Sequence, residues 1–205
     1  MSESKRSRAS RGPIIISRHG RPALDRSAGP KLDWRAYVEW WDAYEAGGLA
    51  EGQAPPPDLV KAVSNTDLVL SSVRKRAVQT ALLATEGREP TQDALFNEAP
   101  LPPPRLPGQR YLPKTWNILA RMAWLQGHSL DGESVSEARR RAIAAAECLD
   151  TYAQQGSVYL AAHGWFNRML RRPLRGQGWV CVRDGGDKYW SFRVYEYRGK
   201  SKDEH

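Results

Sequence analysis

The 205-residue sequence is poor in cysteine and histidine, with two of the first and four of the second. Cys148 and Cys181 lie far apart and have no metal-ligand spacing, so they predict neither a disulfide framework nor a zinc site. No apolar run is longer than a strand, which argues against a membrane-spanning helix, and no signal-peptide core follows the first residues. We therefore expect a cytoplasmic protein.

Acidic residues are fewer than basic ones. The chain has 23 Asp and Glu and 31 Lys and Arg, which gives a net charge of +8. Basic clusters occur at 74–76, 139–141 and 168–175, and others lie in the first twelve residues. No recognised nucleic-acid-binding motif accompanies them, so the sequence does not favour a nucleic-acid partner. A basic cleft that attracts an anionic substrate explains the balance equally well.

Short apolar runs alternate with segments of helical period along the chain. Strands are predicted at 13–17, 67–71, 90–96, 157–162 and 188–197. Helices are predicted at 34–46, 58–63, 73–85, 114–126, 135–154 and 165–170. This alternation predicts an α/β class protein, a three-layer α/β/α fold with a mostly parallel sheet. Aromatic and polar residues alternate in 188–197, which indicates a half-exposed antiparallel edge strand.

The composition predicts one domain at 13–197, between a disordered basic arm at 1–12 and a short tail at 198–205. A proline-rich stretch that can be neither helix interior nor central strand begins at residue 99. We interpret about 99–131 as a small lid insertion beside the site. The oligomeric state stays open, because the edge strand at 188–197 could pair with another chain or be covered by a loop.

Two histidines each follow a strand-like apolar run and are each followed by glycine, as His19-Gly20 and His163-Gly164. In an open α/β sheet, ligands bind outside the carboxyl ends of the parallel strands. The two imidazoles could therefore face one another across one pocket. Histidine can act there as a base, a metal ligand or a nucleophile.

A second candidate lies in Ser71–Ala81, where two serines leave a strand and arginines occupy the first turn of a helix. Free N–H groups and the helix dipole both favour an anion at this position. Arg76 is four residues from Ser72 and shares the face of the helix mouth, whereas Arg74 and Lys75 point elsewhere.

Five motifs in this order resemble those of the histidine phosphatase superfamily, in its phosphoglycerate-mutase-like branch. They are Arg18-His19-Gly20, Ser71–Ala81, Glu98 after the third strand, Gly132-Glu133-Ser134 and Ala162-His163-Gly164. The resemblance covers about residues 13–197. It implies that His19 is the nucleophile that becomes a phosphohistidine, while Arg18, Arg76 and His163 bind the phosphoryl group. Glu98 would be the proton donor, with Glu133 as its competitor, and no metal or other cofactor is needed.

The resemblance implies a phosphatase that hydrolyses a phosphate monoester or a phosphohistidine, on a small phosphorylated substrate or a phosphoprotein. Two alternatives stay open: a phosphomutase of the phosphoglycerate mutase type, and a non-catalytic module that binds a phosphorylated ligand. Arg21–Asp25 departs from the Glu-Thr and asparagine that often follow the first motif, so the phosphoglycerates are not implied as substrates. The lid charges either point to an acidic or multiply phosphorylated substrate or are solvated; they are Arg105, Arg110, Lys114 and Arg121.

Overall fold

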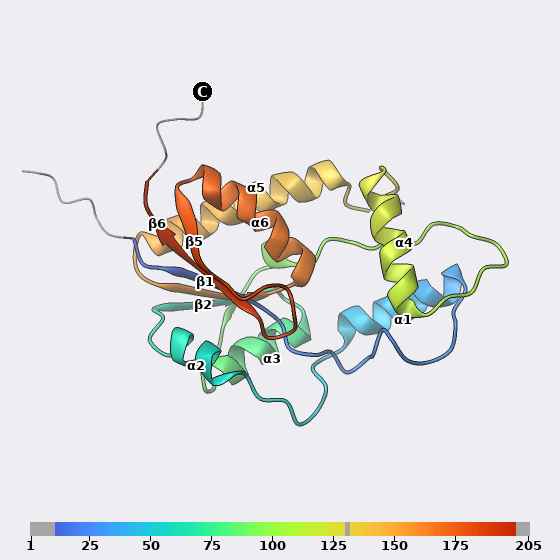
Figure 1. Cartoon of the computed structure of the whole chain (residues 1–205), viewed down its shortest axis with the longest axis horizontal. Coiled ribbons are helices and arrows are strands. Elements are labelled where there is room, and N and C mark those ends of the chain that lie inside the picture. Colours follow the sequence, from blue (N-terminus) through green and yellow to red (C-terminus); the bar gives the residue numbers. More distant parts are fainter. Residues whose placement is uncertain (1–10, 130–131, 200–205) are drawn as a thin grey trace, which may run out of the picture.

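The computed structural model describes residues 11–129 and 132–199, and six strands in these residues form one sheet (Figure 1). Their order across the sheet is β3-β2-β4-β1-β6-β5. The bounds are β1 (Ile14–Arg18), β2 (Leu68–Ser71), β3 (Thr91–Gln92), β4 (Val158–Ala162), β5 (Trp179–Asp184) and β6 (Phe192–Tyr197). The first four pair in parallel, and β6 pairs antiparallel with both β1 and β5. The predicted mostly parallel sheet with an antiparallel edge is confirmed.

The helices cover both faces of this sheet, so the predicted three layers are present (Figure 1). Their bounds are α1 (Trp34–Ala46), α2 (Pro57–Val63), α3 (Lys75–Ala84), α4 (Pro113–Leu125), α5 (Val135–Ala153) and α6 (Gly164–Gly176). Alternate residues of β1 face the two apolar cores: Ile14 and Ile16 pack with α5 and α6, and Ile15 packs with α2 and α3. Helices α1 and α4 stand beyond the carboxyl ends of the strands.

Local capping sets several helix starts. The Asp33 side chain accepts hydrogen bonds from the N–H groups of Arg35 and Ala36, and Ser134 forms a capping box with Glu137. These two helices, α1 and α5, begin where the sequence predicted. Helix α6 runs past its predicted end at residue 170 to Gly176, with Pro173 in its last turn.

The strand predictions fail at the two sides of the sheet. The strand predicted at 90–96 is only two residues long, because the Asp93 side chain accepts a hydrogen bond from Leu95 N–H and starts a 3-10 turn. The segment at 188–197 supplies an inner strand, and β5, which the sequence did not predict, lies outside it. Arg193, one of the polar residues of that alternation, is buried and paired with Asp184 and Asp187.

Three predicted segments lie partly outside the described residues: 1–10 of the basic arm, 130–131 of the lid insertion and 200–205 of the tail. The described end of the arm packs on the last turn of α5. Arg11 pairs with Asp150 at 3.3 Å, and Gly12 N–H donates to the Ala153 carbonyl at 2.8 Å. Within the described residues, no helix is long and apolar enough to cross a membrane.

Candidate active site

His19 follows the last residue of β1 and lies beside the carboxyl end of β4, where its N–H donates to the Ala162 carbonyl at 2.9 Å. Its ring is buried, and its Nδ1 lies 2.7 Å from the Gly20 carbonyl oxygen. Because a carbonyl can only accept, Nδ1 carries the hydrogen and Nε2 keeps its lone pair. A Cβ on Gly20 would come within 2.6 Å of the Trp190 ring, so this turn needs glycine.

Arg18 lies beside His19 with its guanidinium held on two sides. Nη1 donates to the Asp187 carbonyl at 2.6 Å, and the guanidinium carbon lies 4.2 Å from the centre of the Tyr189 ring. A Cβ on Gly164 would come within 3.0 Å of Arg18 Nε. The second glycine of the two His-Gly pairs therefore makes room for the arginine of the first.

Arg76 lies in the first turn of α3 and is buried. Its Nη2 donates to Glu45 Oε1 at 2.6 Å, and its Nη1 donates to the carbonyls of Tyr44 and Glu45, at 3.1 and 3.2 Å. Glu45 Oε2 also pairs with Arg74 at 2.9 Å. The carboxyl end of α1, with its negative dipole and a carboxylate, thus fixes this arginine. Nothing in the sequence singled out Glu45.

His163 precedes α6 and is fully buried, and its ring centre lies 5.2 Å from that of His19. Its Nε2 lies 2.7 Å from Ser72 Oγ, and its Nδ1 lies 3.4 Å from Arg76 Nη2. A guanidinium only donates, so Nδ1 accepts and Nε2 donates to the serine. The two histidines do come together as predicted. His163, however, is not among the residues that line the cavity described below.

Burial lowers the pKa of both His19 and His163 well below the usual value, and the positive charge of Arg76 lowers it further. Both imidazoles are therefore neutral at neutral pH. An unprotonated Nε2 is the form of histidine that can attack an electrophile.

Glu98 lies at the amino end of α6 and lines the same cavity. Its carboxylate accepts hydrogen bonds from the N–H groups of Trp165 at 3.1 Å and Phe166 at 2.8 Å, and from that of Ala99 at 3.0 Å. These three donors hold the side chain in one orientation.

Glu133, the other candidate acid, and His128 lie outside the cavity. Glu133 forms a two-pronged ion pair with Arg141, at 2.7 and 2.8 Å. His128 is half-buried, and its Nε2 lies 3.3 Å from the Pro103 carbonyl oxygen. Of the two candidate acids, only Glu98 reaches the cavity.

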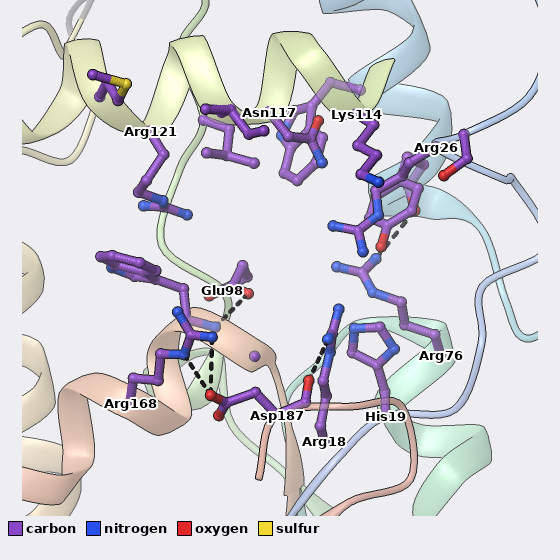
Figure 2. A pocket seen from close by; sticks show the side chains of 18 residues that line it. Arg18, His19, Arg26, Arg76, Glu98, Lys114, Asn117, Arg121, Arg168 and Asp187 are labelled. Atoms are coloured by element: carbon purple, nitrogen blue, oxygen red, sulfur yellow. Dashed lines mark hydrogen bonds and ion pairs between the residues drawn. The ribbon is translucent and has the colours of Figure 1, made fainter. Parts of the chain in front are cut away.

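The cavity has a volume of about 560 Å³ (Figure 2). We call Arg18, His19, Arg76 and Glu98 its floor. Its roof is the facing side of α4, defined by Lys114, Asn117, Ile118, Arg121 and Met122. The sequence predicted charge at Lys114 and Arg121 but missed Arg26, Arg168 and Asp187 in the walls.

The lid charges predicted from the sequence divide between two places. Arg105 and Arg110 line a separate hollow together with Asp33 and Trp34. Burial lowers the pKa of Arg121 to about 10, so this guanidinium in the roof is still charged at neutral pH. In the part of the chain that the structure describes, no group of three or more His, Cys, Asp or Glu side chains could hold a metal ion.

The family model of the histidine phosphatase superfamily, branch 1, matches residues 50–203. The matched part contains Arg76, Glu98 and His163, and it begins after His19. No sequence among the curated proteins is similar enough to this chain to count as a match.

Several solved structures are similar in fold. A protein of Thermus thermophilus is 23% identical, with a TM-score of 0.58, over 92% of this chain and 95% of that one. Phosphoserine phosphatase from Entamoeba histolytica, in complex with 3-phosphoglyceric acid, is 15% identical, with a TM-score of 0.52, over 80% of each chain. A mycobacterial glucosyl-3-phosphoglycerate phosphatase is 19% identical, with a TM-score of 0.50, over 78% and 77%.

Proposed function

Because the chain belongs to the histidine phosphatase superfamily, we propose that it is a phosphatase that acts through a covalent phosphohistidine on His19. The observation that carries the proposal is the state of His19. Its Nδ1–H donates to the Gly20 carbonyl, and its neutral Nε2, which has no hydrogen-bond partner within residues 11–129 and 132–199, lies beside two arginines, Arg18 and Arg76. A neutral nucleophile beside two guanidinium groups is suited to attack on a phosphoryl group.

The reaction has two steps. In the first, Nε2 of His19 attacks phosphorus, the ester P–O bond breaks, and protonated Glu98 gives its proton to the leaving oxygen. In the second, water attacks phosphorus and gives a proton back to Glu98, while the P–N electron pair returns to His19 and phosphate leaves. Arg18 and Arg76 stabilise the charge on the phosphoryl oxygens, which is the largest contribution expected of the protein. The arginines take the place of a metal ion in this proposal.

His163 acts in this scheme as a supporting group. Its Nδ1 accepts from Arg76 and its Nε2 donates to Ser72, so it helps to orient the arginine that holds the phosphoryl group.

Phosphoryl labelling tests the proposal directly. We expect wild-type protein that is quenched during turnover of p-nitrophenyl phosphate to carry an acid-labile, base-stable phosphoryl group, and His19→Ala to carry none and to lose turnover. Unchanged hydrolysis by His19→Ala would refute the nucleophile. Binding without any turnover would identify a non-catalytic module, and transfer of the label to a second substrate molecule instead of water would identify a phosphomutase.

A further inference from the structure

The cavity holds more positive charge than one phosphoryl group can neutralise. In the floor, Arg76 already pairs with Glu45. Arg26, Lys114 and Arg121 also line the cavity, and within residues 11–129 and 132–199 none of the three has a carboxylate within 4.0 Å. A phosphoryl group brings at most two negative charges, and Arg18 and Arg76 already contact the place beside His19. Lys114 and Arg121 in the roof are therefore available to bind a second anionic group.

Three polar side chains of α4 point into the cavity from one face of the helix (Figure 2). Lys114, Asn117 and Arg121 recur at three- and four-residue spacing, which places them in one row. Asn117 Oδ1 accepts a hydrogen bond from the Tyr37 hydroxyl at 2.8 Å, so its NH₂ group is the part left to meet a ligand. The row therefore offers donors to the cavity.

Arg121 is held in place before any ligand arrives. Its guanidinium carbon lies 4.7 Å from the ring centres of both Trp124 and Trp165, and Nη2 donates to the Ala99 carbonyl at 3.2 Å. Its Nη1 is enclosed and has no hydrogen-bond partner among the described residues. A buried donor without a partner costs free energy unless a ligand satisfies it. This distinguishes Arg121, although not the exposed Lys114, from a solvated surface charge.

We propose that the α4 row of Lys114, Asn117 and Arg121 binds a second anionic group of the substrate, a carboxylate or a second phosphate. The inference rests on the proposed phosphatase function, because the first phosphoryl group must lie at His19. The substrate is then a small molecule with two anionic ends, and Ile118 and Met122 of the same helix contact the part between them. A cavity of about 560 Å³ is within the usual range for sites of small ligands.

The test compares substrates that differ only in the second group. The first pair is 3-phosphoglycerate with glycerol 3-phosphate, and the second is fructose 1,6-bisphosphate with fructose 6-phosphate. We expect wild-type kcat/KM to favour the more anionic member of at least one pair about tenfold or more, the size of a charge-assisted hydrogen bond. The pair with the larger ratio tells a carboxylate from a phosphate. No preference in either pair would overturn the inference.

Variants then assign the preference to the row. Lys114→Met should reduce the preference about tenfold, and Arg121→Lys, which keeps the charge but loses the planar fork, should reduce it less. Lys31→Met removes one exposed positive charge that does not line the cavity, and should leave the preference unchanged. An equal loss on both members of a pair would show general attraction of anions and overturn the assignment.

The two proposals fail differently. If wild-type protein hydrolyses p-nitrophenyl phosphate but shows no preference within either pair, only the second anion site is wrong. If it hydrolyses nothing, calorimetric binding of the same four compounds to His19→Ala still tests the row. Tighter binding of the more anionic members, lost in Lys114→Met on that background, would support it, and equal binding would overturn it.

Discussion

The floor and the roof of the cavity are built in different ways. In the floor, Arg18, His19 and Arg76 are each held by hydrogen bonds to backbone carbonyls, and the latter two are almost completely buried. In the roof, Arg121 is held by the Ala99 carbonyl and two tryptophan rings, but Lys114 is exposed, and neither has a carboxylate within 4.0 Å in the part of the chain that the structure describes. Preorganised cations beside the nucleophile serve the reaction, whereas a helix face on the opposite side of the cavity serves recognition of the rest of the substrate. Substitutions in the floor should therefore affect every substrate, and those in the roof should separate one substrate from another.

The largest effect should come from Glu98→Gln. Loss of a general acid typically costs about 10²- to 10⁴-fold in rate, and we expect this loss in kcat for alkyl phosphates. The loss should be much smaller for p-nitrophenyl phosphate, because its leaving group needs little protonation. Steady-state kinetics on both substrates measure the difference. Glu89→Gln, an exposed change of the same kind, should have no effect, and equal losses on the two substrates would exclude Glu98 as the proton donor.

A smaller loss is expected for Glu45→Gln, which removes the carboxylate from Arg76 without changing the shape of the side chain. A hydrogen bond between charged groups contributes about 1.5–3 kcal/mol, so kcat should fall by about ten- to a hundredfold on all substrates alike. Glu39→Gln, an exposed change on the same helix, is the matched control. If Glu45→Gln changed only KM, and only for some substrates, Glu45 would act with the roof and not with the floor.

The mildest test concerns stability. The pKa of His19 and of His163 is lowered in the folded protein, so below about pH 6.5 the unfolded chain takes up protons that the folded chain does not. The free energy of unfolding should therefore fall as the pH falls from 7 to 5. The slope should approach about 1.4 kcal/mol per pH unit for each imidazole.

Urea unfolding at several pH values measures this slope. His163→Asn should remove about half of it, whatever the variant does to stability at pH 7. A flat profile between pH 5 and 7 in the wild-type protein would mean that the two imidazoles titrate normally. The region around His19 and His163 would then be less enclosed than the contrast between the buried floor and the exposed Lys114 of the roof implies.

The sequence predicted those parts of the molecule that depend on neighbours along the chain. A β-branched run that ends in Arg18-His19-Gly20 is such a local pattern, and so is the Asp33 cap of α1. The lateral order of the strands depends on distant segments, and the sequence therefore placed 188–197 at the edge and missed β5. The partners of the site residues were hidden for the same reason. Glu45 is 31 residues from Arg76, and Asp187 is 169 residues from Arg18.

The position of Glu45 has a consequence for exchanging parts between related proteins. Helix α1 contributes Trp41 and Tyr44 to the cavity wall, and its last turn carries the carboxylate that fixes Arg76. A chimaera that receives another protein's segment in place of residues 26–50, in order to change what the cavity accepts, loses this brace as well. Such a chimaera keeps its catalytic activity only if the incoming segment places a carboxylate beside Arg76.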